Sequence, residues 1–145
     1  MAPVDIEVEK AEVTDVLGQF WESWETEDLE LFSRVMAHDP DMVDFGTDAA
    51  ERWVGWDALR ESMQQQMDAY ESFEPSVKEQ VVKVHETGTV AWFSSVLNLR
   101  IVPADGDPIE LEGVRATGVL EKRAGNWLIV QFHGSLPVAG QAVEY

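Results

Sequence analysis

The 145 residues include 28 acidic and 10 basic side chains, and the resulting formal charge of −18 disfavours binding to nucleic acid and to anionic lipid. The absence of cysteine excludes disulfides and thiolate chemistry, and no apolar run is long enough to span a membrane. The N-terminal residues are acidic and lack the basic start of a secretory signal, so we expect a cytoplasmic protein. Length and apolar content predict a single domain over residues 1–145, with a loose arm over 1–6.

The acidic residues are spread along the chain and are not gathered in one tail. This distribution favours a general role in solubility. The functional alternative is attraction of a cationic partner.

Apolar residues recur at helical spacing in the first half of the chain. We expect one helix from Glu7 to about Glu25, a second short helix capped by Thr26 or Asp28, and a third from Trp56 to about Ser72. The apolar positions of these helices are Val13, Leu17, Phe20, Trp21 and Trp24, then Leu29, Phe32, Val35 and Met36, then Trp56, Leu59, Met63, Met67 and Tyr70.

The rest of the chain has the composition of β-strands. Two short strands are expected near residues 42–46 and 52–55, before the third helix. Four long ones follow, near 76–86, 89–102, 109–123 and 126–136. Helices first and hairpin-linked strands last predict an α+β fold. Long antiparallel strands twist strongly, so the sheet should curl and leave a cavity at one end beneath the helices.

Three segments resemble the SnoaL-like branch of the nuclear-transport-factor-2-like superfamily: Glu27–Leu29, Gly46–Gly55 and Trp127–Ser135. The resemblance implies a cone-shaped α+β barrel. In it, three N-terminal helices pack on a strongly curved antiparallel sheet that encloses a pocket, and the protein is usually a homodimer. We expect the sheet face to be the interface, because an uncovered apolar sheet face favours a partner. Members of this superfamily include isomerases, dehydratases, cyclases, hydrolases and non-catalytic modules, so the fold alone does not choose a function.

Asp44 is the first candidate site residue. The resemblance places it near the carboxylate that acts as general base in the ketosteroid isomerases, whose apolar site raises the pKa of that group modestly. The second half of that site is missing, because Phe20 on the first helix and Ala116 or Gly118 on the late strand offer no side-chain donor where the isomerases have one. We therefore do not predict a steroid isomerase. The alternative for Asp44 is a strand-edge acid bonded to turn amides.

His133 is the second candidate catalytic residue. Strict alternation puts Trp127, Ile129, Gln131, His133 and Ser135 on one face of the last strand, which would give a pocket with an apolar floor and a polar mouth. A neutral histidine there could act as acid, base or donor. The alternative is a core histidine bonded to a neighbour.

Arg115 is the one cation in a long apolar stretch. If Ala124 and Gly125 form a two-residue hairpin, residue 115 pairs with 134, and Arg115 faces away from His133. A β-bulge would reverse this orientation. Arg115, Ser135 and Trp53 are the candidate ligand-binding residues, and the alternative for Trp53 is a core residue.

No metal or cofactor is expected, because the three histidines are far apart and no phosphate or dinucleotide motif occurs. The sequence leaves three functions open. The first is a pocket for a small, partly apolar molecule that carries a carboxylate or carbonyl. The second is an acid–base enzyme that uses Asp44 or His133, and the third is a dimerisation module.

Overall fold

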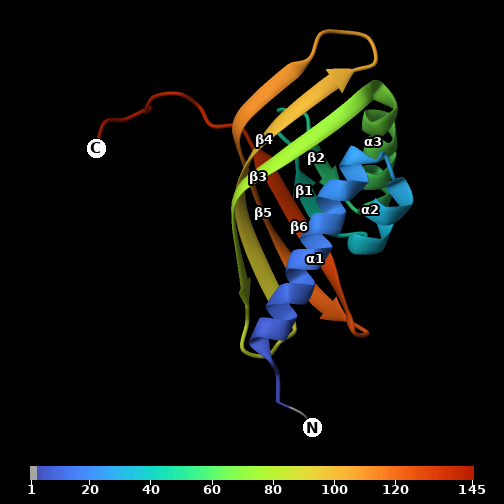
Figure 1. Cartoon of the computed structure of the whole chain (residues 1–145), viewed down its shortest axis with the longest axis vertical. Helices are drawn as coiled ribbons and strands as arrows, with labels where there is room; N and C mark the ends of the chain where they lie inside the picture. Colours follow the sequence, from blue (N-terminus) through green and yellow to red (C-terminus); the bar gives the residue numbers. More distant parts are fainter. Residues whose placement is uncertain (1–2) are drawn as a thin grey trace.

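A computed structural model describes residues 3–145. Helices α1 (Ile6–Glu25) and α2 (Leu29–Val35) come first, followed by the short strands β1 (Val43–Phe45) and β2 (Arg52–Val54) and helix α3 (Trp56–Ala69) (Figure 1). The long strands are β3 (Tyr70–Val84), β4 (Val90–Pro103), β5 (Ile109–Arg123) and β6 (Asn126–Ser135). This is the predicted α+β order, and the fold is the cone-shaped one that the resemblance implied.

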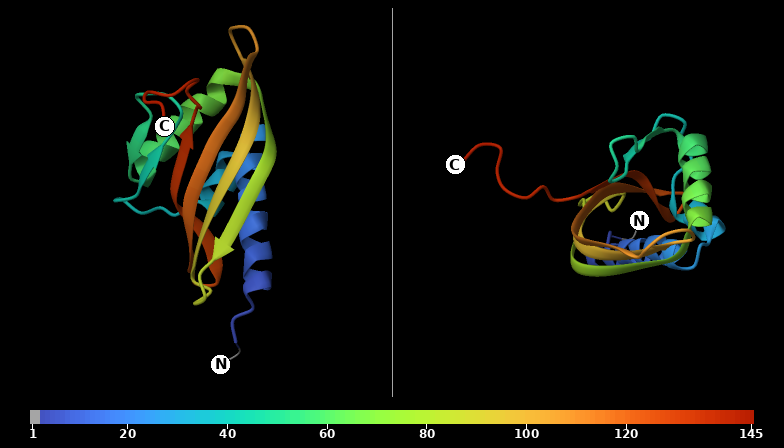
Figure 2. Two further views of the ribbon diagram at one scale, coloured as in Figure 1. Left: turned by 90° about the vertical axis from the view of Figure 1, so that its left-hand side faces the viewer. Right: turned by 90° about the horizontal axis from the view of Figure 1, so that it is seen from above.

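The six strands form one open sheet in the order β2-β1-β6-β5-β4-β3. Strands β3 to β6 pair antiparallel, whereas β1 pairs parallel with β6 through Phe45 and His133. The sheet is therefore mixed: its four long strands are antiparallel as predicted, and the parallel pairing of β1 with β6 is an addition that the prediction did not include. Seen from above, the long strands curve around α1, while α3 lies beside the curved sheet (Figure 2).

Two boundaries differ from the sequence prediction. Helix α3 ends at Ala69, and Tyr70 is the first residue of β3, with extended backbone angles. Its hydroxyl donates a hydrogen bond of 2.9 Å to the Trp24 carbonyl. No glycine or proline marks this junction, so the helical spacing of Met67 and Tyr70 hid it. Helix α1 begins at Ile6; of the arm predicted over residues 1–6, residues 1 and 2 lie outside the described residues.

Each of the first two helices begins at an aspartate cap. Asp5 accepts from the backbone N–H groups of Glu7 and Val8, and Asp28 accepts from that of Leu31. Such caps satisfy amide groups that have no partner within the helix. Of the two predicted caps for α2, Asp28 holds the position. Among residues 3–145, no helix is long and apolar enough to cross a membrane.

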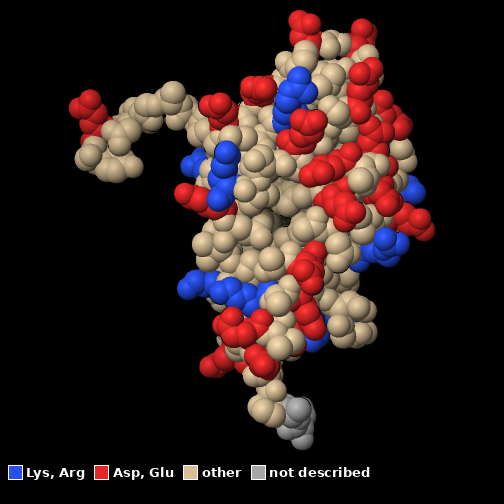
Figure 3. All heavy atoms as spheres, in the orientation of Figure 1, with Lys and Arg blue, Asp and Glu red and all other residues tan. Residues whose placement is uncertain are grey.

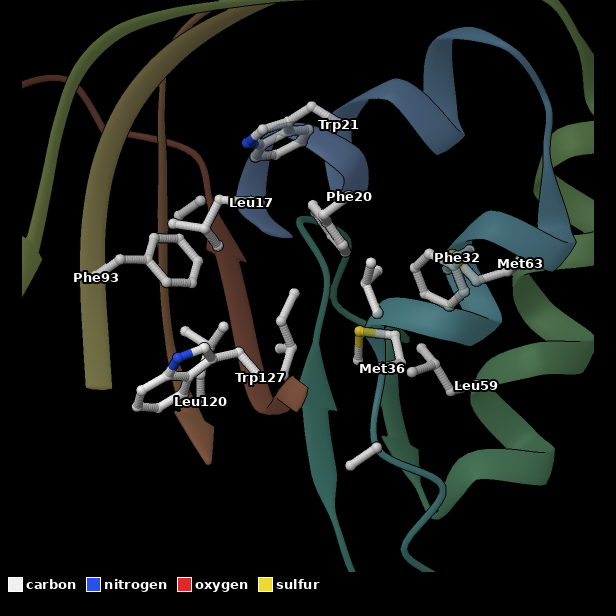
Figure 4. Close-up of a cluster of buried hydrophobic side chains, with 14 of the residues drawn as sticks. Leu17, Phe20, Trp21, Phe32, Met36, Leu59, Met63, Phe93, Leu120 and Trp127 are labelled. Carbon is white, nitrogen blue, oxygen red and sulfur yellow. The ribbon is translucent and has the colours of Figure 1, made fainter. Parts of the chain in front are cut away.

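The hydrophobic core lies between the three helices and the concave face of the sheet (Figure 4). Leu17 of α1 lies next to Phe93 and faces Leu120 and Trp127 of the sheet, while the Phe20 ring packs 5.7 Å from that of Phe32. Phe32, Met36, Leu59 and Met63 close the other side, where α2 meets α3.

Ion pairs fix the end of the molecule where β5 turns into β6. Lys122 contacts Glu9 of α1 at 2.8 Å, and the Trp127 indole N–H donates to the same carboxylate at 2.8 Å. Arg123 holds Asp39 through two bonds of 2.6 and 2.8 Å. The hairpin turn is thus tied both to α1 and to the loop before β1, and this loop positions the candidate site. We call this the closed end.

Candidate functional site

A cavity of about 350 Å³ lies between the helices and the concave sheet face, away from the closed end. Its wall includes residues from all three helices and from the β1–β2 hairpin, and residues where β4 ends and β5 begins. Most of the wall is apolar, and much of that is aromatic. The aromatic lining residues are Phe20, Trp21, Trp24, Phe32, Phe45, Trp53, Phe73 and Phe132.

Asp44 is the buried acid of this wall, with 1% of its surface exposed. It pairs with Trp53 across the β1–β2 hairpin, so both side chains lie on the inner face. The parallel pairing of β1 with β6 also brings it next to Phe132, whose backbone N–H donates to Asp44 Oδ1 at 2.7 Å. The Asp44 carboxylate is therefore held at a fixed place by one oxygen.

Burial raises the pKa of the Asp44 carboxyl from 3.8 to about 6, and the bond from Phe132 offsets part of this rise. At pH 7 the group is mainly ionised, and a modest further loss of solvation would raise its pKa toward the neutral range. Such a carboxyl can both accept and return a proton.

Three of the lining residues each have a buried polar atom that has no hydrogen-bond partner among the described residues. They are Oδ2 of Asp44 and the indole nitrogens of Trp21 and Trp24. Unpaired buried polar groups are few in native proteins, and each calls for an explanation. Here one acceptor and two donors belong to residues that line the same cavity.

The two indole groups could not be assigned to a site from the sequence, which predicts only that Trp21 and Trp24 are core residues. Both do pack in the core: Trp21 contacts Phe20 edge to face, and Trp24 stacks on Phe73, with ring centroids 4.9 Å apart in each pair. Sequence spacing predicts which side of a helix is buried, but it cannot show whether a buried indole N–H finds an acceptor.

The rim of the cavity is formed by the β1–β2 hairpin, which includes Thr47, Asp48 and Glu51. Glu51 Oε1 accepts from the Asp48 backbone N–H at 2.8 Å, so this side chain caps the turn. A Cβ on Gly46 would meet Glu51 and Trp53 at 2.8 Å, so only glycine leaves room for this packing.

A register shift in the β5–β6 hairpin decides where Arg115 lies. Leu120 pairs with Ile129, but Val119 pairs with Gln131, which leaves Val130 as an extra residue. Beyond this bulge Arg115 pairs with Ser135, and Thr117 pairs with His133. Arg115 and His133 therefore do share a face, as the bulge alternative predicted.

That face is the outer one. Arg115, Thr117 and His133 are exposed, while their strand neighbours Ala116 and Gly134 are buried and line the cavity. Strict alternation along β6 was wrong, because Trp127 and Ile129 point inward but Gln131, His133 and Ser135 do not.

Asp44 and Trp53 thus lie together on the cavity wall. Arg115, His133 and Ser135 lie on the other side of the sheet and do not form one site with them.

Acidic side chains gather over the helical side of the molecule in the view of Figure 3. The outer sheet face differs. A shallow depression there is lined by Val81, Trp92 and Thr117, among others, and its described lining residues include no Asp or Glu. Trp92 is 43% exposed. The molecule therefore has an enclosed site with one buried carboxylate and, on the opposite side of the sheet, an acid-poor patch.

Comparison with known proteins agrees with this architecture. No curated protein matches the chain in sequence. An NTF2-like superfamily protein from Salmonella enterica serovar Typhimurium superposes with a TM-score of 0.83 at 19% identity, covering 96% of this chain and 99% of that one. A "putative dehydratase from the NTF2-like family" of Streptomyces avermitilis gives 0.80 at 18% identity, covering 93% and 100%.

At these identities the structural neighbours support the fold alone. A family model provides the assignment, since the SnoaL-like domain matches residues 13–139, most of the chain. The chain belongs to the SnoaL-like domain family.

Proposed function

We propose that this protein binds a small, largely apolar molecule in the cavity, with Asp44 and the indole N–H groups of Trp21 and Trp24 as its polar contacts. The observation that carries the proposal is that three residues lining this cavity have an unpaired buried polar atom, among the residues that the structure describes. The cavity volume of about 350 Å³ lies in the usual range for small-molecule sites. A carbonyl or hydroxyl on the ligand would accept from the indole groups.

Binding can be tested with a neutral bicyclic probe, naphthalenemethanol, by isothermal titration calorimetry. Ala116 lines the cavity, so Ala116→Leu should fill part of it and weaken probe binding about tenfold or more. Thr117→Leu is the matched control, because the neighbouring residue faces outward. Equal affinity in the wild type and in Ala116→Leu would contradict the proposal.

An acid–base enzyme is the second candidate, and the raised pKa of Asp44 favours it. In this mechanism the carboxylate takes a proton from a bound carbonyl compound and returns it at another position. The Streptomyces avermitilis protein is named a putative dehydratase, and a dehydration shares the proton-removal step, although there a hydroxyl group then leaves as water. His133 lies on the outer face and has no part in this mechanism.

Proton exchange gives a test that needs no knowledge of the substrate. The protein should accelerate exchange of the α-hydrogens of β-tetralone in deuterated buffer, as measured by NMR. Asp44→Asn should return the rate to the buffer background, whereas Glu86→Gln, which removes one charge in the exposed β3–β4 turn, should not. A wild-type rate equal to background would exclude this chemistry for such ketones.

We also propose a homodimer through the outer sheet face. On a chain with a charge of −18, two copies repel least where acidic side chains are sparse, and the depression around Trp92 is such a place. Exposed Val81 and Trp92 would be buried there.

Light scattering should give a dimer for the wild type and a monomer for Trp92→Glu. Val138→Glu, which adds the same charge to the exposed C-terminal tail, should remain dimeric. A monomeric wild type would end this proposal.

A further inference from the structure

The polar residues around the cavity are neutral or acidic. They are Asp44, Thr47, Asp48, Glu51 and Gln66. No lysine, arginine or histidine occurs among the lining residues that the structure describes. A ligand with a carboxylate, which the sequence had left open, would enter a site without any cation to receive it.

Asp44 lacks a counter-charge among residues 3–145. Its described hydrogen bond is the one from the Phe132 backbone to Oδ1, and no basic group contributes to its pKa. Oδ2 is buried and unpaired. An isolated buried carboxylate is costly, and a cation beside it would remove much of that cost.

The surroundings of this carboxylate also suit a positive charge. Phe132, whose backbone binds Asp44, packs its ring 4.9 Å from Phe20 and 6.2 Å from Trp21, measured between centroids. Aromatic faces attract ammonium groups, most strongly where water is excluded. The apolar wall would hold the rest of such a ligand.

The rim adds a second electrostatic contribution. Asp48 and Glu51 stand at the entrance, and one carboxylate oxygen of Glu51 is already used by the turn. Together with the charge of −18, these groups raise the local concentration of cations and repel anions. Rim and interior therefore favour the same sign of ligand.

We propose that the ligand is an organic cation, namely an amine whose ammonium group pairs with Asp44 Oδ2 and whose apolar body contacts the aromatic wall. This proposal rests on the function proposed above and narrows it. Asp44 supplies the charge, the aromatic rings supply the dispersion and cation–π contacts, and the acidic rim discourages carboxylates.

Three probes with the same ring and different charge test the proposal: naphthylmethylamine, naphthalenemethanol and naphthoate, each titrated into the full chain by calorimetry at pH 7. We expect the amine to bind about tenfold or more tightly than the alcohol, and the acid to bind more weakly than either. In Asp44→Asn the amine and the alcohol should bind with similar affinity. Glu86→Gln controls for the change in net charge and should keep the preference.

The possible failures can be told apart. If the alcohol or the acid binds as tightly as the amine, the cavity is a binding site without preference for cations, and this inference is overturned while the proposed function stands. The inference is also overturned if the amine preference persists in Asp44→Asn. If none of the probes binds, the proposed function fails as well.

Discussion

Replacing Asp44 with asparagine is expected to raise the free energy of unfolding at pH 7 by up to about 3 kcal/mol. The pKa of the carboxyl is about 6 in the folded protein and 3.8 as the reference value for the unfolded chain. A pKa difference of this size means that ionisation of Asp44 lowers the free energy of unfolding by about 3 kcal/mol. Asparagine keeps an oxygen for the Phe132 N–H and carries no charge.

The pH dependence has a definite sign. Between about pH 4 and 6 the folded state binds more protons than the unfolded state, so the wild type loses stability as the pH rises through this window. Above about pH 6 the carboxyl is ionised in both states, so its contribution to the free energy of unfolding no longer changes with pH. The difference between Asp44→Asn and wild type should therefore grow from pH 4 to 6 and then level off.

Urea denaturation of both proteins across this range measures the effect, and taking the difference cancels the titration of the other acidic groups. Glu86→Gln, with the same change in net charge at an exposed turn, should follow the wild type closely. If Asp44→Asn were less stable than the wild type at pH 7, the carboxylate would be a stabilising group and could not be an uncompensated charge.

A second large effect is expected at Gly118, where alanine should cost about 3 kcal/mol. A Cβ at this position would meet the Gln131 carbonyl at 2.5 Å and the Phe93 ring at 2.7 Å. The carbonyl belongs to the backbone just past the bulge, so it cannot move without changing the strand pairing. Overpacking of a rigid core site costs about 1–3 kcal/mol or more.

Gly18→Ala is the matched control for Gly118→Ala. In helix α1 the added methyl group meets nothing within 4 Å, and alanine favours a helix over glycine, so a gain of about 0.5–1 kcal/mol is expected. Thermal unfolding followed by circular dichroism measures both variants. A neutral result for Gly118→Ala would mean that the bulge can shift to make room.

Much of the fold could be predicted from the sequence because each helix or strand has its own spacing of apolar residues, which can be recognised within that segment alone. The helix carrying Leu17 and Trp21 and the hairpin at Ala124 are examples. The parallel pairing of β1 with β6 could not be predicted, since it depends on a contact between residues 88 apart that no local pattern encodes, as in the bond from Phe132 to Asp44.

The candidate site was predictable only in part, for the same reason. Asp44 was chosen through the resemblance to the ketosteroid isomerases, and Trp53 belongs to the Gly46–Gly55 segment that carries the resemblance; the two residues pair across the β1–β2 hairpin. His133 and Ser135 were assigned to a pocket by alternation along β6, and the extra residue at Val130 places them on the outer face. Arg115 was assigned to the pocket through a bulge and the family resemblance; the bulge exists and brings Arg115 and His133 to one face, but that face is the outer one. The bulge has no glycine or proline to announce it. Its position follows from the sheet's curvature, which is a property of all the long strands together.

The ion pairs at the closed end have a consequence for motion. Glu9, Asp39, Lys122 and Arg123 tie the hairpin turn to two other parts of the chain, whereas the Arg100–Glu110 pair near the opposite end is longer, at 3.7 Å, and solvent-exposed. The free energy of local opening should therefore fall along the long axis, from the hairpin turn toward the cavity entrance. A ligand could then enter through fluctuations of the cavity entrance while the closed end keeps its structure.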